Sequence, residues 1–391
     1  MARVSIAGVG MTDFRTPSTQ APYQASGAAA ARAALADAGL DYADIDLVVA
    51  GYCMGDTCSG QTVAYQLGLT GVPVVNTTNA CASGSAALYL ARQTILSGEA
   101  RSVLVVGFEE MGRTLQMGWP EKLSPVGWID DRTRALRGED ANVSTTGWFA
   151  GAASEYLNRT GYGPEVLAAI GVKARRHAHD NPHAAFRDLV TLEEVMASKM
   201  IVDPLTKFEC SAPASGAAAA VLTSERFARE KGLGSGVFLV AQAMGTDAPS
   251  AQQSDSMINL VGYDMAKTTA DLLYERAGVG PEDIDVVELH DCFASNELLS
   301  YEALGLAGEN EGGRMALDGD NTHGGRYLVN PSGGLIGKGH PIGATGVAQC
   351  VELTHQLRGT AGLRQRPGAR TALQHNLGLG GACVVGLYVR D

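Results

Sequence analysis

The chain has 391 residues, of which 45% are hydrophobic and 18% are charged, and its formal net charge is −12. This length supports two or three domain-sized units, and the composition is typical of a soluble globular protein. The acidic balance argues against nucleic-acid binding through a broad basic surface, so an anionic substrate would need a local basic patch.

The seven cysteines are odd in number and widely spaced, with no Cys-x-x-Cys pair. This pattern argues against a disulfide framework and against a zinc ribbon, so we expect no metal. The N-terminus shows no signal-peptide pattern, no apolar run reaches the ~18–20 residues that span a bilayer, and the C-terminus carries no peroxisomal tripeptide. We therefore expect a cytoplasmic protein with no membrane span.

Cys81 is the first candidate nucleophile along the chain. It lies in a run of small residues, 79–88, where an apolar strand over 72–75 leads into an Ala-rich helix over 82–96. A thiol at the start of a helix lies at the positive end of the helix dipole, and such cysteines often have lowered pKa values. We predict an activated nucleophile. The alternative is a buried structural cysteine, because free Cys is among the most buried residue types.

The regular alternation of apolar strands and helices is looser in residues 112–231. This stretch contains all three tryptophans, Trp119, Trp128 and Trp148. We interpret them as a helical insertion that contributes a substrate-binding surface. Most of its charges, including the basic cluster at 173–177, are assigned to a solvated helix face. The insertion separates an N-terminal half, residues 1–111, from a C-terminal half, residues 232–391. Residues 212–225 are a candidate for a further strand of the N-terminal half.

An internal repeat predicts the architecture. Residues 38–48 match residues 277–287 at a constant offset of 239 positions, and in each copy a helix (about 22–38 and about 257–277) ends at a glycine before an apolar strand. Cys81 and Gly84 match His340 and Gly343 at an offset of 259. Helix–loop–strand units of this kind predict βαβ topology with mostly parallel strands. A true duplication predicts that two helix N-termini face one pocket. The alternative is chance similarity between Gly/Ala-rich segments.

The second half carries its own group of chemically active residues. His290 and Cys292 follow an apolar strand over 285–289, and His340 opens a small-residue helix after the glycine-rich run 330–334. Groups at strand ends and helix starts can converge for proton transfer or oxyanion binding. A lone histidine is more often structural, but two histidines and two cysteines in such places indicate a catalytic site.

These segments together resemble the thiolase superfamily, and most of all the thiolases of the sterol carrier protein X type, also called lipid-transfer-protein thiolases. The resemblance covers nearly the whole chain, and the His-Asp-Cys-Phe run at 290–293 combined with the Gly-His-Pro-Ile-Gly-Ala-Thr-Gly run at 339–346 is specific. It implies an α/β thiolase fold, in which two duplicated βαβαβαββ halves form a five-layered αβαβα core with an inserted helical loop domain. The other segments that carry the resemblance are 8–12, 195–199, 261–265, 296–298, 330–338 and 374–381.

The resemblance implies an acyltransferase that cleaves a 3-oxoacyl-CoA with CoA, giving an acyl-CoA plus acetyl-CoA or propionyl-CoA, in fatty-acid β-oxidation or sterol side-chain degradation. Cys81 would carry the acyl group, and His340 would activate the Cys81 thiol and contribute to an oxyanion hole. Cys292 would protonate the leaving carbanion and later deprotonate the incoming CoA thiol. His290 would serve an oxyanion hole directly or through water. The backbone N–H groups of Cys81 and Gly380 would form a second oxyanion hole.

One departure from the commoner thiolases supports the narrower assignment. Those enzymes bring the second cysteine from a C-terminal Cys-x-Gly loop, where this chain has glycines at 378 and 380. Cys383 lies beyond this loop in an apolar run and is assigned to packing, so Cys292 takes the role, as in the His-Asp-Cys-Phe subgroup. The resemblance also implies that Ser211 contacts the pantetheine arm, that CoA is a substrate and no cofactor is bound, and that the protein is a homodimer or a dimer of dimers.

Two other functions stay open on the sequence. The first is a thiolase-like lyase or acyltransferase that works with an OB-fold partner chain, as some relatives do. The second is a non-catalytic acyl-CoA or lipid carrier, which an intact catalytic set disfavours.

Overall fold

The computed structural model describes residues 3–112, 126–234 and 236–391. Trp119 lies outside these residues. None of the helices within them is long and apolar enough to cross a membrane.

The first half is a βαβαβαββ unit whose last strand returns after the insertion. Its strands lie in the order β3-β2-β4-β7-β1, with β2, β3 and β4 parallel and β7 antiparallel to both β4 and β1. The elements are β1 (Val4–Met11), α1 (Tyr23–Ala38), η1 (Tyr42–Asp44), β2 (Leu47–Gly51), α2 (Ser59–Tyr65), β3 (Val74–Thr77), α3 (Ser83–Ser97), β4 (Ser102–Glu109), β7 (Gly216–Ser224) and α8 (Glu225–Lys231).

The second half repeats this plan. Its strands lie in the equivalent order β10-β9-β11-β12-β8, with β12 antiparallel to its two neighbours. The predicted duplication is therefore confirmed by the sheet topology. The elements are β8 (Val237–Gly245), α9 (Ser250–Gln253), α10 (Met257–Leu260), α11 (Tyr263–Ala277), η3 (Pro281–Asp283), β9 (Val286–Glu288), α12 (Ala294–Ala303), α13 (Gly312–Asp318), β10 (Leu328–Val329), α14 (Gly334–Gly337), α15 (Thr345–Arg358), η4 (Gly362–Arg364), β11 (Thr371–Gly378) and β12 (Ala382–Arg390).

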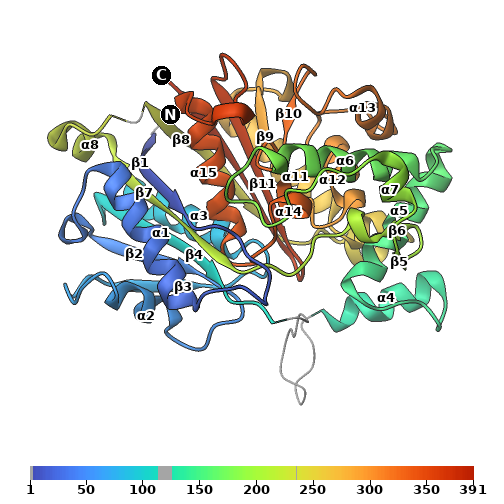
Figure 1. Cartoon of the computed structure of the whole chain (residues 1–391), viewed down its shortest axis with the longest axis horizontal. Coiled ribbons are helices and arrows are strands. Elements are labelled where there is room, and N and C mark those ends of the chain that lie inside the picture. Colours follow the sequence, from blue (N-terminus) through green and yellow to red (C-terminus); the bar gives the residue numbers. More distant parts are fainter. Residues whose placement is uncertain (1–2, 113–125, 235) are drawn as a thin grey trace.

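The two halves join along β1 and β8 into one ten-stranded mixed sheet that folds around a central helix layer (Figure 1). Helices α3 and α15 pack against each other between the sheet halves, whereas α1 covers the outer face of the first half and α11 that of the second. The layers therefore alternate αβαβα, as predicted. The alanine run 217–220 of β7 is fully buried, and its small side chains let α1 and α15 approach opposite faces of one strand.

The helix ends of the repeat behave as predicted, with one difference. Gly39 and Gly278 both take left-handed conformations (φ 67° and 66°) as the C-caps of α1 and α11. The helix expected over 257–277 is in fact two helices, because Gly262 (φ 98°) interrupts it before Tyr263. A left-handed glycine inside the segment cannot continue the α-helical backbone, so α10 ends and α11 starts afresh.

The insertion between β4 and β7 packs mainly against the second half (Figure 1). Lys173 and His177 depart from the solvated helix face expected for most charges of the insertion: both are buried, and Lys173 forms an ion pair with the buried Glu297 of α12. The division at residues 112 and 231 stays a prediction. The described elements of the insertion are α4 (Gly127–Arg137), α5 (Thr145–Thr160), α6 (Glu165–His179), α7 (Leu192–Met196), β5 (Met200–Val202), β6 (Leu205–Thr206) and η2 (Lys207–Glu209).

Candidate active site

A tight turn between β3 and α3 holds Cys81. Ala80 takes a left-handed conformation (φ 47°), which is uncommon for a residue with a side chain and often marks a functional site. The Ser83 hydroxyl closes the turn, because it accepts a hydrogen bond from the Asn79 N–H (2.8 Å) and donates one to the Ala80 carbonyl (2.7 Å). Cys53 also donates its thiol proton to that carbonyl (3.0 Å).

The turn that carries His340 meets the Cys81 turn across the centre of the molecule. Both turns precede a helix of the central layer, and they pack so closely that a Cβ atom on Gly84 would lie 2.7 Å from the Gly343 carbonyl oxygen. Glu109, buried at the end of β4, accepts hydrogen bonds from the backbone N–H groups of Gly343 (2.9 Å) and Cys53 (3.0 Å). Because Gly84 has no side chain, the two turns can touch, and the Glu109 side chain bonds to backbone from both halves. These contacts hold the two halves together beside the candidate nucleophile, Cys81.

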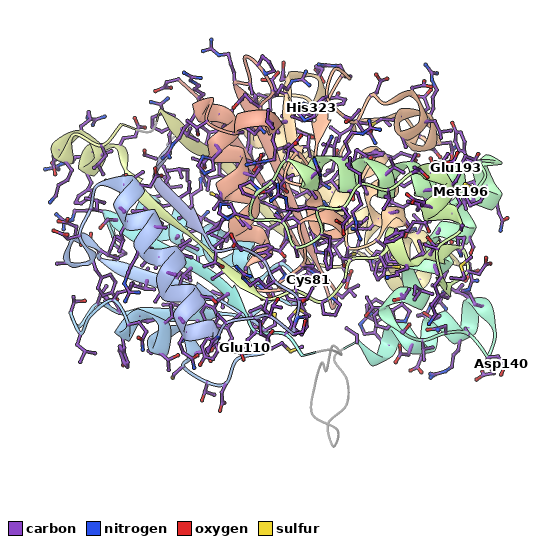
Figure 2. The ribbon with its side chains drawn as sticks, in the orientation of Figure 1. Cys81, Glu110, Asp140, Glu193, Met196 and His323 are labelled. Carbon is purple, nitrogen blue, oxygen red and sulfur yellow. The ribbon has the colours of Figure 1, made fainter. Side chains whose placement is uncertain are left out.

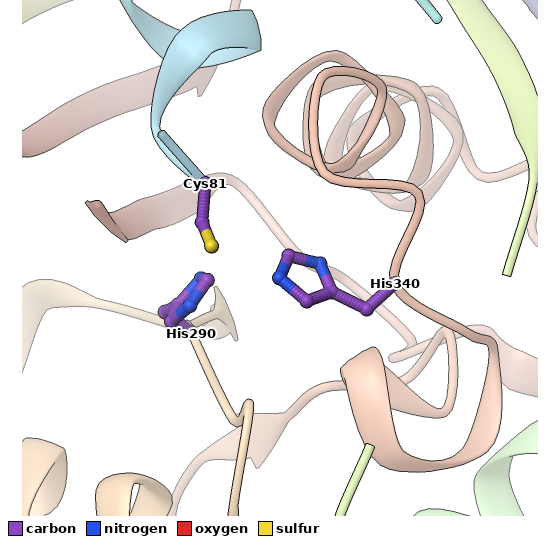
Figure 3. Close-up of side chains that lie close together, drawn as sticks. All are labelled: Cys81, His290 and His340. Atoms are coloured by element: carbon purple, nitrogen blue, oxygen red, sulfur yellow. The ribbon is translucent and has the colours of Figure 1, made fainter. Parts of the chain in front are cut away.

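Cys81, His290 and His340 converge at this junction (Figure 3), and Figure 2 shows where Cys81 lies in the whole molecule. The Cys81 Sγ and one ring nitrogen of each histidine lie within 4.8 Å of one another. The two imidazole rings are 5.2 Å apart, edge to face. These three donors could also hold a metal ion, since thiolate and imidazole are zinc ligands, but they equally suit acyl transfer to sulfur.

The site opens into a cavity of about 480 Å³ lined by both halves and the insertion. Cys292 lies in this cavity with Cys81 and both histidines, and so does Ser211, whose N–H donates to the Cys292 carbonyl (2.9 Å). The β11–β12 turn that contains Gly380 packs nearby: a Cβ atom on Gly378 would be 3.1 Å from the Ala82 nitrogen. The apolar part of the lining comprises Ala80, Met111, Val126, Val143, Trp148, Ala212, Pro213, Phe293, Ile342, Leu377 and Leu379.

Burial controls the protonation of the whole site. The prediction of a lowered thiol pKa is wrong, because burial raises the pKa of Cys81, and Cys53 and Glu109 nearby raise it further. Burial also raises the pKa of Cys292 well above its ordinary value. It lowers the pKa of His340 to about 3, and Lys338 contributes in the same direction. The resting pair is therefore a neutral thiol beside a neutral imidazole, since desolvation outweighs the helix dipole.

The hydrogen bonds of His340 fix which ring nitrogen can act as a base. The Thr345 hydroxyl donates to the Pro341 carbonyl (2.9 Å), so it must accept the hydrogen bond from His340 Nδ1 (2.7 Å). The proton of the neutral ring is then on Nδ1, and Nε2 carries a lone pair. Nε2 is buried and has no hydrogen-bond partner among the described residues. His340 is thus prepared to accept a proton.

Three residues of the site were missed from the sequence. Thr345 and Asn376, which donates to His290 Nδ1 (3.1 Å), both lie inside motifs that were recognised, but nothing in their spacing indicates what they contact. Glu109 ends β4, and its only signal is a carboxylate directly after an apolar strand.

Comparison with known proteins agrees with this geometry. A model of the thiolase N-terminal domain matches residues 4–226, and a model of the thiolase C-terminal domain-like family matches residues 246–385. The chain therefore belongs to the thiolase family, a family of acyltransferase enzymes.

Within the family it is similar to the human protein sterol carrier protein 2, with 47% identity over 99% of this chain and 72% of that protein. It is 35% identical to the benzoylsuccinyl-CoA thiolase subunit BbsB of Thauera aromatica over 97% of this chain and 95% of the subunit. Two solved structures show the same fold: an Ltp2–ChsH2(DUF35) aldolase (TM-score 0.83, 24% identity, 100% of this chain and 98% of that chain) and human mitochondrial 3-ketoacyl-CoA thiolase (TM-score 0.74, 18% identity, 100% and 99%).

Proposed function

We propose that this protein is a degradative thiolase that cleaves a 3-oxoacyl-CoA with CoA, releasing acetyl-CoA or propionyl-CoA, through an acyl-Cys81 intermediate. The observation that carries the proposal is the convergence of one thiol and two imidazole nitrogens within 4.8 Å, in the lining of a cavity that also holds a second cysteine. Each group has a protonation state that suits one step of this reaction.

In the first step, the Cys81 sulfur attacks the 3-keto carbon while its proton moves to His340 Nε2. The C2–C3 bond then breaks, the acyl group stays on sulfur, and the electron pair passes into the enolate of the departing thioester. Its oxygen is stabilised by N–H groups of the two histidines. Cys292 gives its proton to C2, and a thiol with a raised pKa is still protonated and available for this step.

In the second step, the Cys292 thiolate takes the proton of an incoming CoA thiol. The CoA sulfur attacks the acyl-enzyme, and the Cys81 sulfur leaves and recovers its proton from His340. The backbone N–H groups of Cys81 and Gly380 stabilise the oxyanion of this step. Loss of one such donor typically lowers the rate by ~10²–10³-fold.

The cavity supports a substrate with a mainly apolar acyl group. Its lining combines mainly apolar side chains with a few hydroxyl-bearing residues, among them Ser144, Thr145 and Ser211. We assign the pantetheine arm to the side of Ser211. A panel of 3-oxoacyl-CoAs with and without a 2-methyl branch tests the chain length and branching that the cavity accepts.

Replacing Cys81 with Ala tests the reaction itself. The wild-type chain should cleave acetoacetyl-CoA or a longer 3-oxoacyl-CoA only when CoA is present. Mass spectrometry after a quench should find the acyl group on the peptide that contains Cys81, and C81A should show neither product nor adduct. Full activity of C81A would refute the proposal. Activity of the purified chain alone would also separate a thiolase from an aldolase that needs a partner chain.

We further propose that the protein is a homodimer. β3 is the edge strand of the first half, and Val75 on it is 39% exposed. An unpaired strand edge of this kind pairs readily with another chain. Light scattering at micromolar concentration checks this, and a monomer mass would contradict it.

A further inference from the structure

The sheet register brings Asn376 beside His290. β9 and β11 are parallel neighbours in which Glu288 lies opposite Gln374, and continuing this register by two residues pairs His290 with Asn376. The Asn376 Nδ2 lies 3.1 Å from His290 Nδ1, and both side chains are buried. The Asn376 Oδ1 has no hydrogen-bond partner among the described residues. Within the part of the chain that the structure describes, the Asn376 amide therefore makes its one side-chain hydrogen bond to the His290 ring.

This contact determines where the proton of His290 lies. An amide nitrogen carries only hydrogens, so it donates, and the Nδ1 that accepts must hold a lone pair. Burial lowers the pKa of His290 well below its ordinary value, and His340 and His375 nearby contribute in the same direction. The ring is neutral and has a single proton, which is then on Nε2.

The neighbouring histidine favours the same arrangement. His340 has the opposite tautomer, because Thr345 accepts its Nδ1 proton and leaves the lone pair on Nε2. One nitrogen of each ring belongs to the group that lies within 4.8 Å. Two lone pairs facing each other at this distance would repel, whereas an N–H of His290 complements the lone pair of His340.

We propose that Asn376 is a positioning residue that keeps the His290 proton on Nε2, so that the ring donates a hydrogen bond to the thioester oxygen of the substrate. The inference rests on the proposed function and deepens it. Two equivalent imidazoles become a base and an oxyanion donor because Thr345 accepts from one ring and Asn376 donates to the other.

The proton position can be measured without any turnover. We would label histidine with ¹⁵N, record NMR spectra of the wild-type protein, and assign His290 by the signals lost in H290N. The expected result is a protonated Nε2 and an unprotonated Nδ1 for His290. A proton on Nδ1 would overturn the proposal, whatever the enzymatic activity.

The isosteric variant N376D gives a pH signature that a structural role would not produce. A carboxylate only accepts, so it draws the proton to Nδ1, and His290 can then donate from Nε2 only as an imidazolium. We expect kcat/KM of N376D to fall with rising pH as the imidazolium loses its Nε2 proton, while the wild type shows no such step. A profile parallel to that of the wild type would overturn the proposal.

A double-mutant cycle distinguishes action through His290 from a general effect on the fold. N376L should lower kcat by about 2- to 12-fold in the wild type, which corresponds to one hydrogen bond. An asparagine at 290 needs no tautomer control, so the same leucine in the H290N background should cost less than twofold. Equal losses in both backgrounds would overturn the proposal. If the wild type cleaves no 3-oxoacyl-CoA at all, the proposed function fails, and the NMR measurement still decides the tautomer.

Discussion

Thr345→Val removes the group that prepares His340 as a base. The side chain keeps its shape but loses the oxygen that accepts the Nδ1 proton at 2.7 Å. In the variant a neutral His340 with its proton on Nδ1 has a buried donor without a partner. A proton on Nε2 faces the cavity, where water or substrate can accept its hydrogen bond, so the proton moves to Nε2 and the ring can no longer accept the Cys81 proton.

The magnitude follows from the cost of that unpaired donor. A buried N–H without a partner costs about 1–3 kcal/mol, and each 1.36 kcal/mol changes a population tenfold. The base-competent fraction of His340 should therefore fall by about 5- to 150-fold, and kcat with it. KM should change little, because Thr345 contacts the side of the ring opposite the cavity and is not part of the cavity lining.

The assay is steady-state thiolysis of acetoacetyl-CoA by wild type, T345V and T345S, with thermal unfolding as a check on folding. T345S retains a hydroxyl and should stay within about threefold of the wild type, because the single hydrogen bond is preserved. Thr223 on β7 is a matched control, since its hydroxyl is buried without a partner among the described residues, and T223V should leave kcat unchanged. Equal kcat values for T345V and T345S would refute the tautomer argument.

Three further predictions follow from the protonation states of the site. The rate of Cys81 alkylation by iodoacetamide should rise about tenfold per pH unit from pH 6 to 9 with no plateau, because burial raises the pKa of the thiol. A rate that is already constant from pH 6 upward would mean that Cys81 rests as a thiolate. C292A should lower kcat for thiolysis by about 10²–10⁴-fold, while Cys81 is still alkylated at the wild-type rate. Loss of both the thiolysis activity and the Cys81 alkylation would indicate a disturbed fold. Burial raises the pKa of Glu109 from 4.5 to about 7, so the stability it contributes is complete below pH 4.5 and is lost as pH rises through 7. Urea unfolding at pH 5 and pH 8 should show a decrease of about 3 kcal/mol in the wild type that E109Q lacks, and the same decrease in E109Q would contradict the assignment.

The features that were predictable from the sequence depend on local patterns. The glycine caps at 39 and 278 and the matched positions of Cys81 and His340 predict the duplication, because caps and helix starts leave residue-specific signals. The same patterns predict Cys292 in the same cavity.

The features that were missed depend on tertiary contacts. The burial of Lys173 follows from Glu297, which is 124 residues away in the chain and has no local signature. The direction of the Cys81 pKa shift depends on desolvation by both halves, which the helix-dipole argument alone does not include. The proton positions of the two histidines depend on hydrogen bonds whose geometry no sequence pattern specifies.

The duplication itself explains why nucleophile and base meet. Cys81 and His340 occupy equivalent positions in the two halves, each just before a central helix, and residues close to a twofold axis necessarily lie near their symmetry equivalents. The contact of Gly84 with the Gly343 carbonyl marks that axis. A symmetric pair of cysteines or of histidines there would supply two nucleophiles or two bases. Catalysis therefore needs the halves to differ at this one position, and the burial that comes with this closeness keeps both groups neutral until a substrate carbonyl arrives.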